Sequence, residues 1–120
     1  MSIKVEDYYP RETFNKMKAF ADQHETPFVV IDTAIISQAY DDLRAGFEFA
    51  KVYYAVKANP AIEIIELLRD KGSNFDIASI YELDKVLSAG VSPDRMSYGN
   101  TIKKALSLIH ISEPTRQAEI

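Results

Sequence analysis

The sequence predicts an α/β fold in which short parallel strands alternate with helices. Apolar segments of strand length occur at 51–57, 74–78 and 96–98, and amphipathic segments of helix length follow the first two, at 61–71 and 80–89. Strands that alternate with helices of this length form right-handed βαβ units, and such units build a parallel sheet. A closed eight-stranded barrel takes about 250 residues, so this chain of 120 residues can contain only the opening of one.

Residues 1–50 precede this alternation and predict a helix, a strand and a second helix. The first helix is expected at 11–23, where apolar side chains recur at helical spacing and suggest a packing face: Phe14, Met17, Phe20 and Ala21. A buried strand is expected at 28–31, and Asp32 or Thr33 is the expected N-cap of the helix after it. Gly46 is the expected end of that helix.

Composition and charge exclude several classes of function. The net charge of −4 and the scattered basic residues give no nucleic-acid footprint. There is no cysteine, so disulfides and thiolate metal sites are excluded, and we expect no metal site. No apolar run reaches membrane-spanning length and no signal-peptide core is present, so we expect a cytoplasmic protein without a membrane partner.

Lys57 lies at the predicted junction between a strand and a helix. It closes the apolar run 52–56, and Asn59 and Pro60 then supply the N-cap and first-turn residues of a helix. We expect this strand to be covered on both faces, with Lys57 at the ligand-binding edge of the parallel sheet. One interpretation is a surface lysine whose stem lies on apolar side chains. The other is a Schiff-base lysine whose amine attacks a carbonyl group.

Two acidic residues follow in the next strand and helix. Asp76 lies within the apolar segment 74–78, where an unpaired carboxylate is costly, so it is either a site residue or a structural one. Ser79 and Glu82 have the spacing of a capping box, in which each side chain accepts a hydrogen bond from the other residue's backbone N–H. That structural role accounts for Glu82 without any function.

Three motifs in order resemble one enzyme family. They are Tyr-Ala-Val-Lys-Ala-Asn at 54–59, Asn-Phe-Asp-Ile-Ala-Ser at 74–79 followed by Glu82, and Ser-Tyr-Gly-Asn-Thr-Ile-Lys at 97–103. Together they are similar to the pyridoxal-phosphate-dependent ornithine, diaminopimelate and arginine decarboxylases, which have an alanine-racemase-like barrel. Within that family, the resemblance is greatest to bacterial ornithine and lysine/ornithine decarboxylases.

The resemblance implies a fold and a set of site residues. Residues 1–50 would belong to the sheet domain and the entry to the barrel. Residues 51–105 would form the first units of an incomplete (β/α)8 barrel, with about three strand–helix units. Lys57 would bind pyridoxal 5′-phosphate through a Schiff base, and Asp76 and Glu82 would lie near the lysine and the cofactor ring.

The resemblance also implies an activity, the decarboxylation of a basic amino acid. The products would be putrescine from L-ornithine, and cadaverine if L-lysine is accepted, in polyamine biosynthesis. Later barrel strands, a second domain and the partner subunit of a homodimer would supply the rest of the site, so we expect this chain alone to be inactive. Diaminopimelate decarboxylase, a racemase with the same barrel, and a non-catalytic regulatory homologue remain alternatives.

The last segment, 106–120, departs from the family pattern. Residues 106–116 read Leu-Ser-Leu-Ile-His-Ile-Ser-Glu-Pro-Thr-Arg, which resembles the in-frame translation of a transposase-type sequencing-library adapter. Segments of non-biological origin carry no information about a fold. We therefore expect 106–120 to be a non-native tail, and the chain to be the N-terminal part of a larger enzyme.

Overall fold

A computed structural model describes residues Lys4–Gly99. The chain divides into two compact units, residues 1–32 and residues 33–120, and each is described here by itself. The end of the third motif, residues 100–103, and the adapter-like segment 106–120 lie outside the described residues.

The first unit contains a short 3₁₀ turn, η1 (Val5–Asp7), and the helix α1 (Arg11–Ala21). The expected helix is therefore present and ends at Ala21. Three of the four predicted face residues, Phe14, Met17 and Ala21, line an apolar groove. Phe20 does not line this groove, and its ring stacks on His24 with centroids 3.8 Å apart. The helical repeat of about 100° per residue explains the difference, because it places positions 14, 17 and 21 within an arc of about 60° and position 20 about 60° outside that arc.

The strand expected at 28–31 is absent from the structure. These residues form no ladder with other described residues, and Val29 is 84% exposed. The prediction rested on apolar composition alone. A strand also requires a neighbouring strand to accept its backbone hydrogen bonds, and residues 4–32 contain none.

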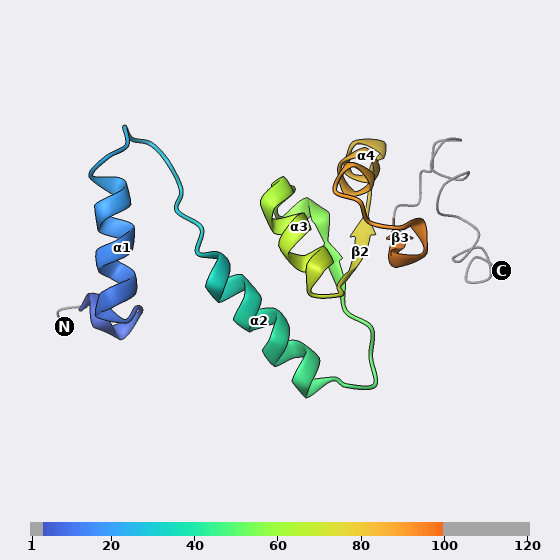
Figure 1. Ribbon diagram of the computed structural model, residues 1–120, viewed down its shortest axis with the longest axis horizontal. Helices are drawn as coiled ribbons and strands as arrows, with labels where there is room; N and C mark the ends of the chain where they lie inside the picture. Colours follow the sequence, from blue (N-terminus) through green and yellow to red (C-terminus); the bar gives the residue numbers. More distant parts are fainter. Residues whose placement is uncertain (1–3, 100–120) are drawn as a thin grey trace. The chain divides into compact units, whose positions relative to one another are not determined.

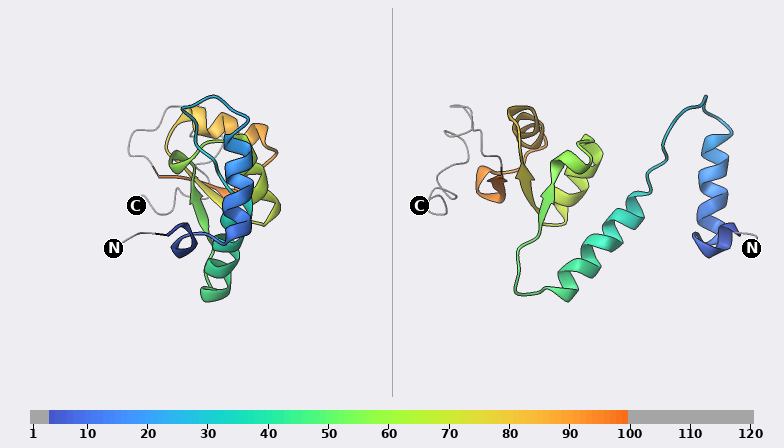
Figure 2. Two further views of the ribbon diagram at one scale, coloured as in Figure 1. Left: turned by 90° about the vertical axis from the view of Figure 1, so that its left-hand side faces the viewer. Right: turned by 180° about the vertical axis from the view of Figure 1, so that it is seen from behind.

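The second unit has the predicted alternation of strands and helices (Figures 1 and 2). Its three strands form a parallel sheet in the order β1-β2-β3. The α/β prediction is thus confirmed, and the order follows the sequence. The elements are α2 (Thr33–Gly46), β1 (Tyr53–Ala55), η2 (Val56–Ala58), α3 (Ile62–Asp70), β2 (Asn74–Ile77), α4 (Ile80–Ser88), η3 (Pro93–Arg95) and β3 (Met96–Tyr98).

The hydrophobic core lies on one face of this sheet. Alternate strand residues are buried together with the apolar residues of α3 and α4: Phe75, Ile77, Met96 and Tyr98 on the strands, and Ile64, Ile65, Leu68, Leu83 and Val86 on the helices. Side chains alternate across a strand, so Asn74, Asp76 and Ser97 belong to the other face, where they are only partly buried. The expectation that β1 is covered on both faces is wrong for the described residues, because Tyr53 is 43% exposed. The two crossover helices, α3 and α4, cover one face of the three-stranded sheet and, within residues 4–99, leave the other face open.

Both crossover helices end in the same way. Gly72 has φ +87° and Gly90 has φ +79°, a conformation that side chains disfavour. After each glycine, the next residue's N–H reaches back to the helix: Ser73 bonds to the oxygen of Leu68 at 2.9 Å, and Val91 to that of Val86 at 3.3 Å. These are Schellman ends, and they turn α3 directly into β2 and α4 towards η3, which precedes β3.

The helix α2 is joined to the end of α3 by Lys71. The Lys71 Nζ atom lies 2.8 Å from Asp41 Oδ2 and 5.9 Å from the centroid of the Tyr40 ring. Tyr40 is the one buried residue of α2. Among the described residues, no helix is long and apolar enough to cross a bilayer.

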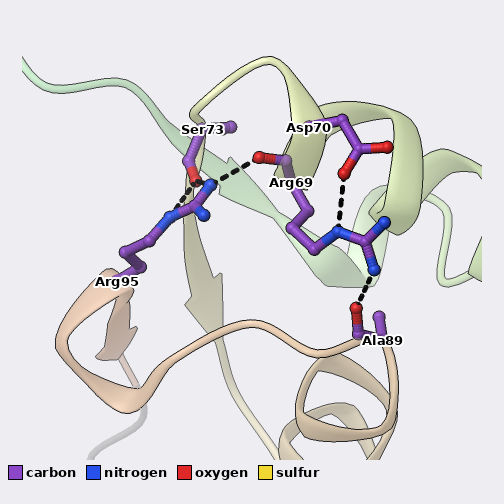
Figure 3. Close-up of polar contacts among 5 residues, drawn as sticks. All are labelled: Arg69, Asp70, Ser73, Ala89 and Arg95. Atoms are coloured by element: carbon purple, nitrogen blue, oxygen red, sulfur yellow. Dashed lines mark hydrogen bonds and ion pairs between the residues drawn. The ribbon is translucent and has the colours of Figure 1, made fainter.

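Two arginines tie the helix ends to each other (Figure 3). Arg95, in η3, donates to the backbone oxygens of Arg69 and Ser73 at the end of α3. Arg69 in turn donates to the backbone oxygen of Ala89 at the end of α4. The last carbonyl groups of a helix have no partner within it, so each guanidinium supplies donors that the helix ends need.

Candidate functional site

Lys57 lies in the turn η2, directly after β1. The sequence placed it at the end of the strand, but the strand ends at Ala55 and a 3₁₀ turn begins at Val56. Its side chain is exposed, and it forms no hydrogen bond or ion pair with any residue between 4 and 99. The strand ends two residues before Lys57 because the chain turns at Val56, whose side chain is fully buried.

The residues after Lys57 also differ from the expectation. The helix α3 begins at Ile62 with Ala61 as its N-cap residue, so Asn59 and Pro60 are not at the N-cap and first helical positions. Asn59 still serves the start of the helix, because its Oδ1 atom accepts a hydrogen bond from the Ala61 N–H at 3.1 Å. An asparagine can bond to the backbone two residues later, and this turn competes with an N-cap geometry.

Tyr54 contacts the same turn and was not singled out from the sequence as a separate site residue. Its hydroxyl donates to the backbone oxygen of Asn59 at 3.0 Å. Burial raises the pKa of the Tyr54 phenol above its usual value of 10.0, and the hydrogen bond with Asn59 acts in the opposite direction. The spacing of five residues between the two is not a known signature, so only the structure reveals this contact.

Asp76 lies on β2 beside the residues that precede Lys57. The strand register aligns Asp76 with Ala55 on one side and with Ser97 on the other. Its carboxylate forms no hydrogen bond within the described part of the chain. Gly99 approaches it closely, since a Cβ atom at Gly99 would stand 2.8 Å from Asp76 Oδ1. Asp76 is therefore half-buried and unpaired among residues 4–99.

Glu82 holds the start of α4. Its backbone N–H donates to Ser79 Oγ at 3.2 Å, and its own Oε2 atom accepts from the Ala78 N–H at 2.8 Å. The serine half of the predicted capping box is confirmed, whereas the glutamate bonds one residue earlier than expected. The structure brings Asp76 to the level of β1 but shows no hydrogen bond or ion pair between Glu82 and Lys57.

The arrangement leaves the amine of Lys57 and the carboxylate of Asp76 without partners among residues 4–99, so both are available for chemistry. Carboxyl ends of parallel strands share one edge of the sheet, and Asp76 is level with Ala55, two residues before Lys57. An uncommitted primary amine is the group that an aldehyde cofactor requires, so these residues fit pyridoxal phosphate. No cluster of three or more acidic or histidine residues that could hold a metal exists within residues 4–99.

Comparison with known proteins agrees with this chemistry. Residues 33–117 match the family model described as the pyridoxal-binding domain of pyridoxal-dependent decarboxylases. The match covers more than half of the chain, and the protein belongs to this family of pyridoxal-phosphate-dependent decarboxylases. The resemblance noted from the three motifs is thereby confirmed.

Individual relatives include enzymes with different substrates in their names. The chain is 38% identical to a lysine/ornithine decarboxylase of Selenomonas ruminantium over 78% of its own length and 24% of that protein. It is also 38% identical to a diaminopimelate decarboxylase of Methanothermobacter thermautotrophicus, over 69% of its own length and 21% of the relative. The chain therefore spans about a quarter of the length of these relatives.

A solved structure agrees with the fold. The lysine/ornithine decarboxylase of Vibrio vulnificus, in complex with cadaverine, superposes with a TM-score of 0.77 and 26% identity. The superposition covers 84% of this chain and 28% of that one. The three-stranded parallel sheet thus corresponds to the N-terminal part of a pyridoxal-phosphate-binding barrel enzyme.

Proposed function

We propose that this chain is part of a decarboxylase for a basic amino acid, L-ornithine or L-lysine, and that Lys57 holds its pyridoxal phosphate. The observation that carries the proposal is the exposed amine of Lys57, which follows β1 and is not used by the fold within residues 4–99. When bound, the cofactor supplies the electron sink that loss of carbon dioxide from an amino acid requires. The products, putrescine or cadaverine, would make this a step of polyamine biosynthesis.

The role proposed for Asp76 is to hold the charge and orientation of the lysine. A carboxylate near an amine favours its protonated form and attracts its N–H donors. Asp76 is suited to this because its carboxylate has no hydrogen-bonding partner in the described chain and because it lies on β2 level with Ala55, two residues before Lys57. Glu82 is proposed to act chiefly on structure, since its carboxylate is already bonded to the backbone.

The complete site requires more protein than this chain. We propose that later barrel strands, a second domain and a partner subunit in a homodimer supply the remaining cofactor and substrate contacts. The 120-residue chain alone should then release no carbon dioxide from ornithine or lysine. Lysine-57-dependent decarboxylation by the isolated chain would contradict this part of the proposal.

Diaminopimelate decarboxylation is the second candidate, because a diaminopimelate decarboxylase is as similar in sequence as the lysine/ornithine enzyme. Carbon dioxide release from ornithine, lysine and diaminopimelate by the full-length protein decides between them.

The role of Lys57 is tested by trapping the cofactor. Full-length protein is incubated with pyridoxal phosphate and reduced with borohydride, and the modified peptide is identified by mass spectrometry. The cofactor should be found on Lys57, and Lys57→Arg should lose both trapping and decarboxylation. Lys51→Arg is the matched control, because Lys51 is another exposed lysine, just before β1. Full turnover by Lys57→Arg would rule out the proposal.

A further inference from the structure

Tyr54 is anchored in the core by its ring. It aligns with Phe75 in the register of β1 and β2, and the two rings meet edge to face, with centroids 6.4 Å apart and planes at 86°. Phe75 has no exposed surface. The edge-to-face contact with a fully buried ring restrains the position of the Tyr54 ring on the sheet.

The hydroxyl of Tyr54 binds the residue that follows the turn carrying Lys57. It binds the backbone oxygen of Asn59, two residues beyond Lys57, at 3.0 Å. The side chain of Asn59 in turn accepts the N–H of Ala61, just before α3. The turn that carries Lys57 is thus held at one end by β1 and at the other by the phenol.

Lys57 itself has no such support. Its side chain forms no hydrogen bond with the described residues, so the direction in which its amine leaves the sheet depends on the backbone of η2. We propose that Tyr54 is a positioning residue, whose hydrogen bond to the Asn59 carbonyl fixes the turn and thereby aims the Lys57 amine at the cofactor. This inference rests on the function proposed above.

The chemistry of the phenol suits this role. Burial raises the pKa of Tyr54, so the hydroxyl keeps its proton and remains a donor at neutral pH. Phenylalanine in its place would keep the ring contact with Phe75 and remove only the donor. The exchange of tyrosine for phenylalanine therefore tests the hydrogen bond alone.

Tyr53 provides a matched control. It is the neighbouring residue on β1, and side-chain alternation puts it on the opposite face. It is 43% exposed, and no hydrogen bond of its hydroxyl to the described residues exists. Tyr53→Phe removes the same atom from the adjacent position without affecting the bond to Asn59.

The first measurement is amide hydrogen exchange in full-length protein, followed in the peptide that contains residues 56–61. Loss of the bond should speed exchange about fivefold in Tyr54→Phe, the equivalent of about 1 kcal/mol, a typical net value for one hydrogen bond. Tyr53→Phe should exchange like the wild type. Equal rates in all three proteins would overturn the proposal.

The second measurement is borohydride trapping of pyridoxal phosphate on Lys57, together with the pH midpoint of the bound cofactor's visible absorbance. Trapping should fall about fivefold in Tyr54→Phe, and the midpoint should shift by up to about 0.7 pH unit, the same free energy expressed as a pKa change. Neither should change in Tyr53→Phe. A structural role without positioning would lower stability and leave the absorbance midpoint in place.

The outcomes separate this inference from the proposed function. Faster exchange with unchanged trapping and absorbance would overturn the positioning role while the function of Lys57 stands. A wild-type protein that traps no cofactor on Lys57 would instead overturn the proposed function, and the positioning role with it.

Discussion

Arg95 donates a hydrogen bond of 2.8 Å to the backbone oxygen of Arg69, which lies 26 residues earlier in the chain (Figure 3). The same guanidinium also binds the backbone oxygen of Ser73, through Nε at 3.1 Å and through Nη2. One side chain from the turn before β3 thus binds two carbonyl groups, one in the last turn of α3 and one just before β2. This contact joins successive strand–helix units from outside the apolar core.

Replacing Arg95 with glutamine should destabilise the second unit by about 1–3 kcal/mol, because it leaves two part-buried carbonyl groups without their charged donor. The loss is measured by urea unfolding or by hydrogen exchange of α3 amides in the full-length protein. Arg44→Gln is the control, since Arg44 also donates to a backbone oxygen, that of Ala50, but in an exposed position. The control should cost under about 0.5 kcal/mol. Equal losses of unfolding free energy in the two variants would show that the part-buried hydrogen bonds of Arg95 stabilise the protein no more than the exposed one of Arg44.

Asp70 should titrate below its usual pKa of 3.8. A hydrogen bond from Arg69 Nε, 2.8 Å from Asp70 Oδ1, is the main cause of the lowered pKa, while partial desolvation opposes it. A carboxyl whose folded-state pKa is depressed contributes stability above its unfolded pKa and loses it as the pH falls through the folded value. The contribution of Asp70 should therefore disappear below pH 3.8.

The Asp70 titration can be followed directly by the NMR shift of its carboxyl carbon. In Arg69→Gln the midpoint should return towards 3.8, whereas Arg95→Gln should move it less, because Arg95 acts only through its more distant charge. A midpoint that stays equally low without Arg69 would contradict this assignment of the cause.

Gly72→Ala should cost about 1–2 kcal/mol, because residue 72 has φ +87° and an L side chain is strained there. A Cβ atom would meet no other atom within 4 Å at this position, so the whole penalty comes from the backbone. Gly46→Ala is the matched control. It also has open space around it, its φ is not positive, and it is the last residue of α2.

The control substitution should be neutral or slightly stabilising, since alanine favours a helix over glycine. Thermal unfolding of both variants in parallel measures the difference. If Gly72→Ala lowers the unfolding temperature no more than Gly46→Ala, the positive φ at residue 72 does not require glycine, and the prediction is wrong.

The repeating part of this fold could be predicted from the sequence because its signals are local. Gly72 and Gly90 mark the helix ends, and the third strand was predicted at its observed bounds, 96–98. The prediction of a strand at 28–31 was wrong because strand formation is not decided by local signals alone. A strand depends on a partner, and a short apolar run carries no information about whether one is present.

The candidate site was only partly predictable. Motif resemblance singled out Lys57 and Asp76, and the strand register places Asp76 level with Ala55, two residues before Lys57. The 3₁₀ turn at Lys57 and the bond from Tyr54 to Asn59 could not be predicted, because both depend on the three-dimensional path of the chain between β1 and α3. Contacts between distant residues, such as Arg95 with Arg69, leave no periodic pattern in a single sequence.

The last prediction separates the two roles considered for Glu82. Ser79→Ala should destabilise the second unit by about 1 kcal/mol, because the Glu82 N–H loses the N-cap oxygen it now binds. Glu82→Gln should cost less than about 0.5 kcal/mol, since glutamine can also accept the Ala78 N–H through its amide oxygen. Urea unfolding of the two variants measures both values.

Cofactor trapping on Lys57 in the same two variants then decides the role of Glu82. If its carboxylate acts only at the helix start, Glu82→Gln should trap pyridoxal phosphate at the wild-type rate. Ser79→Ala should then change trapping only in proportion to its loss of folded protein. A Glu82→Gln variant that is fully stable yet traps several-fold less cofactor would mean that the negative charge itself matters. The structure favours the first result, because both polar ends of the glutamate, its N–H and its carboxylate, are already engaged by residues 78 and 79.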